Sequence, residues 1–399
     1  MTKLKCDKNI VLVNLYSGLI GGVFILPVIV MFFQNQLGLT FGEFMFTQAV
    51  FAAGMFVLEV PTGYIGDLFK RKIVLAISSF FMVLGWLYYW FVADDLAGAI
   101  IAELLLAVGA CFYSGTVNAI LYDHLVDKGW IDEARQQEGR RFGITLYMVG
   151  FASIVGAWLY DHNPMLPVIV TLVTKALGIA AALLMDEPQQ HKEPVRKNPL
   201  HDMAETMRYA LHGHKEVAFL IFAGALIFSS TKISLWVQQP YYEAANIPVA
   251  TFGMLMAASF FVSGIIGQWG HHLDGKLNNR QALFVLFLLQ ALAAAGAAFL
   301  LGPQYVFAGV PVLLLGHLVY GLGYPRFQTA VNNLVESSRR GTILSTSSLM
   351  IQLAAIPLMW LFGIINDHGS LKLALLAQAG LALFIGVPLI LGSMRKRKA

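Results

Sequence analysis

Long apolar stretches separated by short polar connections dominate the pattern of this chain. Twelve such stretches run for about 20 residues or more, the length that an α-helix needs to cross the hydrocarbon core of a bilayer. Backbone amides in lipid must pair within their own segment, so the pattern predicts helices rather than open sheets. The expected spans are residues 10–33, 41–66, 73–93, 97–122, 142–160, 164–186, 216–240, 248–272, 281–301, 306–333, 342–365 and 371–393.

The composition supports a membrane protein. Of the 399 residues, 57% are hydrophobic and 13% are charged, and the mean hydropathy is +0.67. A soluble core of this composition would lack enough polar surface to cover it. The start, "MTKLKCDK", precedes an apolar stretch without a small-residue cleavage site, which indicates a first span rather than a signal peptide. The two cysteines, Cys6 and Cys111, suggest neither a disulfide framework nor a metal site.

One long polar stretch interrupts the apolar pattern between the sixth and seventh spans. Its sequence, "EPQQHKEPVRKNPLHDMAETMRYALHGHKE", begins with prolines that break helices. Its second part fits a short amphipathic helix on the membrane surface. The stretch predicts an N-terminal six-helix bundle in 1–186, a cytoplasmic central loop in 187–215 and a C-terminal bundle in 216–399.

The cations define an expected orientation. With the N-terminus inside, 23 of the 27 Lys and Arg residues fall on the cytoplasmic side, Lys372 falls outside, and Lys175, Lys232 and Arg326 fall within spans. Such an asymmetry follows the positive-inside rule and places both termini in the cytoplasm. The net charge of +4 therefore indicates membrane orientation rather than binding of nucleic acid.

The two halves show signs of a duplication. Gly63 and Asp67 recur as Gly270 and Asp274 at an offset of 207, and the Asp-His pair in "YDHNP" recurs in "NDHGS" at an offset of 206. Each match is weak alone, but the offsets agree at equivalent points between helices. Duplicated bundles suit alternating access, in which two similar halves rock about a site between them.

The stretch "GYIGDLFKRK" between the second and third spans resembles the signature of the major facilitator superfamily. The matching residues are Gly63, Gly66, Asp67, Arg71 and Lys72, with a weaker second copy at Gly270 and Asp274. The resemblance implies an all-α membrane protein with twelve transmembrane helices in two pseudo-symmetric six-helix bundles around a central cavity. Helices 1, 4, 7 and 10 would line the cavity, and helices 2, 5, 8 and 11 would form the bundle interface.

The charges of this connection suggest a gate. Gly63 would let helices approach closely, and Asp67 would accept hydrogen bonds from free amides at the start of the eleventh helix. Arg71 would pair with Asp123 at the end of the fourth span. These contacts would hold the inside closed and break when it opens. The alternative is that the charges only mark and orient a tight loop.

Acidic residues within the spans are candidates for proton coupling. Glu59 lies in the second span, roughly 12 Å along the helix from Asp67, and Pro61 follows it. A carboxylate in a partly dry cleft can take up and release protons. Glu103 in the fourth span is the second candidate. The alternatives are a permanent hydrogen bond to a neighbouring helix for Glu59 and a water-exposed place in the outer leaflet for Glu103.

Substrate candidates come mainly from the expected cavity helices. Lys232, Trp236 and Gln239 share a predicted face of the seventh helix and offer an ammonium, an aromatic wall and an amide. Such stripes also serve as contacts between helices. The other candidates are Asn14, Tyr16, Gln48, Ser114, Asn118, His317, Tyr324 and Arg326.

Three of the polar residues in spans have competing explanations. His317 and Arg326 lie half a turn apart in azimuth, so both face the cavity only if Pro325 kinks the helix. A lone histidine is more often a satisfied packing residue, and Arg326 can reach toward the inner surface. Lys175 falls in a helix expected at the periphery, which requires an acidic or carbonyl partner.

These patterns together favour a monomeric secondary transporter of a cell inner membrane. The expected activity is proton-coupled export of a small amphipathic metabolite or drug that is anionic or zwitterionic. Export rests on the abundance of exporters in the family, because the fourth helix lacks an arginine and the fifth a Gly-Pro-Gly-Gly-like kink. Proton-coupled import, a channel and a non-transporting sensor are the alternatives. No enzyme motif, metal-ligand set or cofactor motif is present.

Overall fold

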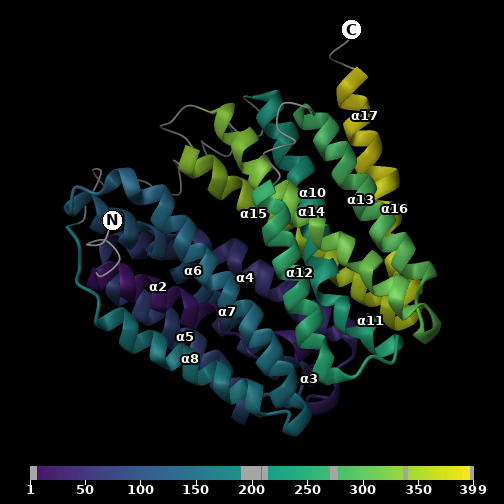
Figure 1. Ribbon diagram of the computed structural model, residues 1–399, viewed down its shortest axis with the longest axis horizontal. Helices are drawn as coiled ribbons and strands as arrows, with labels where there is room; N and C mark the ends of the chain where they lie inside the picture. The colour runs from purple at the N-terminus through teal and green to yellow at the C-terminus, as the bar shows by residue number, and fades with distance from the viewer. Residues whose placement is uncertain (1–6, 190–207, 209–213, 270–276, 336–339, 396–399) are drawn as a thin grey trace. The chain divides into compact units, whose positions relative to one another are not determined.

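The computed structural model describes residues 7–189, 208, 214–269, 277–335 and 340–395 (Figure 1). Twelve helical segments in this part of the chain are long and apolar enough to cross a membrane, which confirms the predicted number. The fold is an all-α membrane protein, as the apolar pattern predicted. Five expected features fall outside the described residues: the surface helix of the central loop, Gly270, Asp274, residues 336–339 before the eleventh span and the side chain of Asp67.

The helices of the first half begin with an interrupted span. That span consists of α2 (Lys8–Gly21), the 3-10 turn η1 (Leu26–Val28) and α3 (Ile29–Gln36). The spans that follow it are α4 (Phe41–Leu68), α5 (Arg71–Phe91), α6 (Leu96–Asp127), α7 (Ala134–His162), which the turn η2 (Ile131–Glu133) precedes, and α8 (Leu166–Leu183).

The helices of the second half include two irregular spans. Val237 separates α10 (Lys215–Trp236) from α11 (Gln238–Ala244), and a π-helical segment, η7 (Leu381–Gly386), separates α16 (Leu371–Gly380) from α17 (Val387–Arg395). The others are α12 (Val249–Trp269), α13 (Asn279–Phe299), the turn η5 (Pro303–Tyr305), α14 (Val306–Asn333) and α15 (Arg340–His368).

The chain forms two compact units whose bounds differ from the predicted bundles. Unit 1 comprises 1–39, 53–199 and 249–257, and unit 2 comprises 40–52, 200–248 and 258–399. The start of α4 therefore belongs to unit 2, and the start of α12 belongs to unit 1. Close backbone contacts explain both assignments, since a methyl group placed on Gly42 would lie 2.9 Å from the Gly363 carbonyl, and one on Gly253 would lie 2.0 Å from the Ser153 carbonyl.

The first span was predicted as one continuous helix from 10 to 33, and this prediction is wrong. Helix α2 ends at Gly21, and the backbone leaves the helical conformation at Gly22. Close packing contributes to the interruption, because a methyl group placed on Gly21 would lie 2.9 Å from the Thr145 carbonyl, and one on Gly156 would lie 1.7 Å from the Phe24 carbonyl.

Helix α8 satisfies the backbone groups that the interruption leaves free. The Lys175 ammonium, 2% exposed, donates to the carbonyls of Leu19 at 3.0 Å, Ile20 at 2.5 Å and Gly22 at 3.2 Å. The Phe24 amide donates to Thr171 Oγ1 at 2.9 Å. Backbone groups at membrane depth need such partners. The carbonyl partner that the sequence required for Lys175 is thus the end of α2.

Each unit has its own apolar core. In unit 1 the core includes Ile10, Tyr16, Leu75, Val117 and Leu125, from α2, α5 and α6. In unit 2 it includes Ile221, Phe228, Phe287, Val319 and Ile343, from α10, α13, α14 and α15. These cores fix the helix faces that carry the polar side chains.

Candidate functional site

The end of unit 1 where α5 begins and α6 and α8 end carries a network of charges. Arg71 Nε donates to Asp123 Oδ2 at 2.6 Å, and the exposed fractions of the two side chains are 17% and 9%. The Glu187 carboxylate accepts from the amides of Arg71 at 2.7 Å and Lys72 at 3.1 Å, which caps α5. Lys72 Nζ donates to the Met185 carbonyl at 3.2 Å.

The pair between Arg71 and Asp123, which the sequence suggested, therefore exists, but both partners belong to unit 1. It joins α5 to α6 within one unit. Its part in a gate stays a prediction, and that part would consist of positioning the connection that carries Asp67.

A second set of contacts extends this charged end along α2. His124 Nε2 lies 2.8 Å from Asp7 Oδ1, and Asn9 Nδ2 donates to the Asp186 carbonyl at 2.8 Å. Lys8 Nζ donates to Asp186 Oδ1 at 2.8 Å. The hydrogen bond from Lys8 is the main cause that lowers the pKa of the exposed Asp186 carboxyl below its ordinary value. The network ties the start of α2 to the ends of α6 and α8.

The glycines of the motif differ in their surroundings. A methyl group placed on Gly66 would lie 3.5 Å from Thr116 Oγ1 of α6, which is ordinary van der Waals contact. A methyl group placed on Gly63 would have no described atom within 4 Å. The close helix approach predicted at Gly63 is therefore absent among the described residues, because Gly63 lies on an exposed face of α4.

Glu59 lies within the continuous helix α4, one turn from Met55 and one from Gly63. Its side chain is partly buried, and its carboxylate is close enough to the Cys111 thiol of α6 to interact electrostatically. The Cys111 thiol also lies 3.3 Å from Met55 Sδ. Thr62 Oγ1 donates to the Leu58 carbonyl at 2.7 Å and so occupies a carbonyl near Pro61. Glu59 is thus a carboxylate within the α4–α6 packing of unit 1.

Glu103, the second acidic candidate, is deeply buried in unit 1. Its side chain is 3% exposed, and its Oε1 accepts from the Tyr89 hydroxyl at 3.0 Å. That hydroxyl also lies 3.3 Å from the Ala99 carbonyl. The position joins α5 to α6 and is not the water-exposed place that was the alternative for Glu103.

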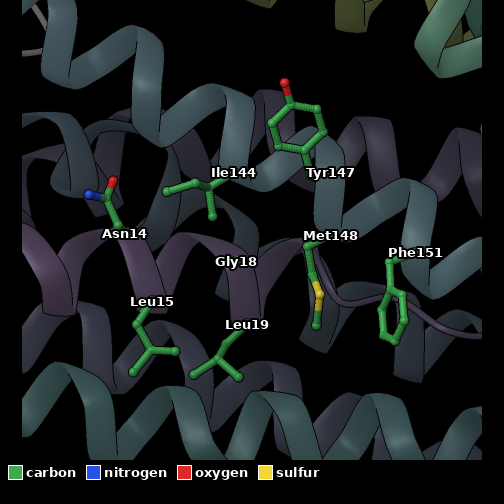
Figure 2. A pocket seen from close by; sticks show the side chains of 8 residues that line it. All are labelled: Asn14, Leu15, Gly18, Leu19, Ile144, Tyr147, Met148 and Phe151. Atoms are coloured by element: carbon green, nitrogen blue, oxygen red, sulfur yellow. The ribbon is translucent and has the colours of Figure 1, made fainter.

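A groove of about 510 Å³ runs along unit 1 between α2 and α7 (Figure 2). In Figure 2 the Asn14 amide lies at one end of the groove and the Phe151 ring at the other. Apolar side chains provide most of the wall. The lining residues are Asn14, Leu15, Gly18, Leu19, Ile144, Tyr147, Met148 and Phe151.

Tyr16, which the sequence placed beside Asn14 as a cavity residue, points elsewhere. It is fully buried, and its hydroxyl donates to the Leu75 carbonyl at 2.8 Å and accepts from Ser79 at 3.1 Å. Two residues along a helix are separated by about 200°, which places Tyr16 against α5. Its position does not support the predicted contact with substrate.

Asn118, one of the predicted substrate candidates on α6, contacts an arginine that the sequence did not identify as a site residue. Ser114 and Asn118 lie on an exposed face of α6. Arg141 of α7 donates through Nη2 to Asn118 Oδ1 at 2.6 Å and through Nη1 to the Tyr113 hydroxyl at 3.4 Å. The sequence assigned Arg141 to a cytoplasmic loop because of the charged run "EARQQEGRR". Helix α7 instead begins at Ala134 and includes that run.

A signal for Arg141 was nevertheless present in the sequence. Gln137, Arg141, Ile144 and Met148 recur at spacings of three and four residues, the period of one helix face. Extending the fifth span backward along this face would have placed Arg141 inside the bundle.

In unit 2 the predicted stripe of the seventh span is divided. Lys232 Nζ donates to Gln352 Oε1 of α15, and the Trp236 ring lies edge-on to Phe44 with centroids 5.3 Å apart. Gln239 falls in α11, beyond the interruption at Val237, and is fully buried. The three residues therefore lie on two helical segments, and their common face stays a prediction.

The candidates on α14 are held by contacts within unit 2. His317 is 8% exposed, and its Nε2 forms a hydrogen bond with the amide of Gln238, while Ser263 Oγ donates to its carbonyl at 3.0 Å. Arg326 Nη2 donates to the Leu277 carbonyl before α13. The Tyr324 ring stacks on Tyr320 with centroids 5.0 Å apart.

Gln48 lies in the part of α4 that belongs to unit 2 and is 7% exposed. Its position within that unit gives it neighbours other than those of Glu59, which belongs to unit 1.

Comparisons with known proteins agree with this architecture. The family model of the Major Facilitator Superfamily matches residues 11–359. An uncharacterized MFS-type transporter of Bacillus subtilis (strain 168), YxaM, is 22% identical over 359 residues, which cover 86% of this chain and 84% of that protein. Two solved structures are similar in fold. The nucleoside transporter NupG has a TM-score of 0.80 at 15% identity and covers 96% of this chain and 98% of its own. A D-xylose-proton symporter has a TM-score of 0.75 at 12% identity, with 96% of each chain covered.

Proposed function

Because the chain belongs to the major facilitator superfamily, whose members are transporters and not enzymes, we propose that it exports a small amphipathic solute by proton-coupled alternating access. The substrate class is an anionic or zwitterionic metabolite or drug. The protein acts as a monomer in the cell inner membrane, with both termini in the cytoplasm.

The observation that carries proton coupling is the Glu59 carboxylate in a membrane-spanning helix. Ionisable groups at such depth are costly unless they serve a site or a proton path. Glu59 sits in the α4–α6 packing beside Cys111, and the exposed polar stripe of Ser114 and Asn118 follows on α6. A proton taken up here changes the charge of unit 1 by one unit during the transport cycle.

The charge of the substrate follows from cations on membrane helices of both units. Lys232 on α10 and Arg141 on α7 carry amide partners, Gln352 and Asn118 respectively. For Arg141, the amide oxygen orients the guanidinium without neutralising it, so its positive charge stays available to an anion. Purely cationic drugs are therefore the less favoured substrate class.

Proton-coupled import is the second candidate. The D-xylose-proton symporter, similar in fold, moves its solute together with a proton by the words of its name. The same carboxylate at Glu59 serves either direction, so direction depends on which gradient drives the solute.

Solute-driven proton movement in proteoliposomes tests the proposal. Vesicles that contain a pH-sensitive dye and protein of known orientation receive a panel of anionic, zwitterionic and cationic amphiphiles. An exporter acidifies the lumen of right-side-out vesicles when internal solute leaves, and a symporter acidifies it when external solute enters.

Two variants connect this signal to Glu59. Glu59→Gln should abolish the coupled proton movement. Glu43→Gln is the matched control on the same helix, since among the described residues Glu43 caps α4 through the Thr40 amide at 2.8 Å and glutamine serves equally well in such a cap. Equal proton movement in wild type and Glu59→Gln would refute coupling through Glu59.

A further inference from the structure

Arg141 is deeply buried, and one of its hydrogen-bond donors lacks a partner among the described residues. It is 7% exposed, and its two terminal nitrogens contact Asn118 and the Tyr113 hydroxyl. Its Nε is buried and has no hydrogen-bond partner in the part of the chain that the structure describes. Among the same residues, no carboxylate forms an ion pair with it. A buried guanidinium in a membrane helix is costly without an anionic partner.

The groove between α2 and α7 includes Ile144, which lies about one turn after Arg141 on α7. A methyl group placed on Gly18 of α2 would lie 3.4 Å from Ile144 of α7. Helix α2 leads toward Gly18 through Asn14, and α7 leads toward Ile144 through Arg141, so both residues lie about one turn before this contact. Asn14 marks that end of the groove in Figure 2.

A second buried polar atom without a described partner lies on the neighbouring turn of α7. Gln137 precedes Arg141 by one turn on α7 and is 6% exposed. Its Oε1 is buried without a hydrogen-bond partner among the described residues. Two neighbouring groups with unused hydrogen-bonding capacity, one donor and one acceptor, suit a ligand head group better than apolar packing.

We propose that Arg141, with Asn118 and Asn14, forms the head-group subsite for an amphipathic carboxylate whose apolar part lies in the α2–α7 groove. This rests on the proposed function and names the substrate class of that transporter. The Nε–H and an adjacent Nη–H of a guanidinium form a fork that matches the two oxygens of a carboxylate. The apolar wall of Leu15, Leu19, Met148 and Phe151 fits a short hydrocarbon chain.

Octanoate is the probe for this subsite, and octylammonium is its matched cation of similar chain length. Isothermal titration of the purified full chain in a neutral detergent should show saturable binding of octanoate and none of octylammonium. Arg141→Gln should weaken octanoate binding by about tenfold or more, the effect of losing a charged hydrogen bond. Arg140→Gln, which changes the exposed neighbouring arginine, should bind like the wild type.

Asn118→Ala provides a second variant in case Arg141→Gln does not fold. It removes the oxygen that orients the guanidinium and should weaken octanoate binding by about threefold or more. Gel filtration and the unfolding temperature without ligand establish that each variant is folded. Equal octanoate affinity in wild type and folded Arg141→Gln, or equal binding of octylammonium, overturns the subsite.

An anionic lipid head group shares the chemistry of the probe, so the titration is repeated in nanodiscs. Phosphatidylglycerol that removes octanoate binding, where phosphatidylcholine does not, would show a lipid site and overturn the solute subsite. Octanoate binding retained in phosphatidylglycerol supports it. The titration needs no gradient, so the two proposals can fail separately. Octanoate binding without solute-driven proton movement would refute only the proposed transport. Solute-driven proton movement without Arg141-dependent octanoate binding would refute only the subsite.

Discussion

Unit 1 and unit 2 both bury amide side chains in an apolar interior, but among the described residues unit 1 also buries side chains of Lys, Arg, Asp and Glu. Lys175, Arg141 and Glu103 are 2%, 7% and 3% exposed in unit 1, and Gln290 and Gln378 are 0% and 4% exposed in unit 2. A neutral amide costs far less than an ion at membrane depth. The charges of unit 1 therefore need a stronger structural or functional reason than the amides of unit 2, although Gln290 Oε1 and Gln378 Oε1 also lack a hydrogen-bond partner among the described residues.

The amides of unit 2 join three helices. Gln378 Nε2 of α16 donates to the Ser230 carbonyl at 2.9 Å and lies 3.1 Å from Ser234 Oγ of α10. Gln290 Nε2 of α13 donates to the same Ser234 hydroxyl at 2.9 Å. Such contacts between helices are typical packing devices in membranes. In unit 1, Lys175 has a comparable structural role, whereas Arg141 has an unused donor.

The largest expected effect is the difference in stability between losing the buried Lys175 ammonium and losing the buried Gln378 amide. Lys175→Met leaves the carbonyls of Leu19, Ile20 and Gly22 without that donor, and we expect it to lower the free energy of unfolding by about 4 kcal/mol. Gln378→Met in unit 2 should cost about 1.5 kcal/mol. Lys128→Met, at an exposed position after α6, is the control. Reversible unfolding in mixed detergent micelles measures all three, and equal losses for Lys175→Met and Gln378→Met would contradict the contrast.

The next effect compares an ion pair in each unit. Asp123→Asn weakens the contact between Asp123, whose side chain is 9% exposed, and Arg71, whose side chain is 17% exposed. The substitution should lower the free energy of unfolding by about 2 kcal/mol. Glu216→Gln weakens the contact with Arg280 in unit 2, where the glutamate is 39% exposed. Solvent screening should limit its cost to about 0.5 kcal/mol. The same unfolding assay measures both variants. A larger loss of unfolding free energy in Glu216→Gln than in Asp123→Asn would contradict the prediction.

A smaller effect distinguishes the two Asp-His pairs that suggested a duplication. Asp367 accepts from the Gly42 amide at 3.0 Å and from Thr40 Oγ1 at 2.5 Å, and so caps α4 within unit 2. Asp161, its expected counterpart, forms no hydrogen bond among the described residues. Asp367→Ala should therefore cost about 1 kcal/mol, and Asp161→Ala should cost little. Thermal unfolding of the two variants in one detergent measures the difference, and similar shifts would show that Asp367 is not a significant cap.

The smallest effect concerns pH at the charged end of unit 1. The pKa of Asp186 is lower in the folded state, chiefly through the hydrogen bond from Lys8. Its contribution to stability is therefore present above the unfolded pKa, near 3.8, and is lost as the pH falls through the folded pKa. The unfolding temperatures of wild type and Asp186→Asn should differ slightly at pH 6, and the difference should shrink as the pH falls below 3.8. A difference that grows on acidification would contradict this sign.

Much of the fold was predictable because span length and apolar pattern are local properties of the sequence. The twelve spans follow from them. The interruption of α2 was not predictable, because it depends on Thr171 and Lys175 more than 140 residues away. The sequence showed that Lys175 needed a partner, but only the packing of α8 on α2 identifies the three carbonyls.

The candidate site was less predictable than the fold. The contact of Arg71 with Asp123 could be proposed from opposite charges at the ends of neighbouring helices, and Asn118 from its polar stripe. Arg141 was missed because the charged run that includes it was interpreted as a loop before the fifth span. Tyr16 was misplaced because the face of a helix that meets a cavity is set by its neighbours, here Leu75 and Ser79.

Hydrogen exchange with mass detection on the wild-type protein, with and without octanoate, tests most directly whether the charged interior of unit 1 recognises the substrate. We predict slower exchange in peptides that cover 113–118 and 137–151, around Arg141 and the groove. Peptides that cover 284–294 and 374–382, which hold the amides of unit 2, should exchange unchanged. Protection confined to the unit 2 peptides, with none around Arg141, would contradict the account.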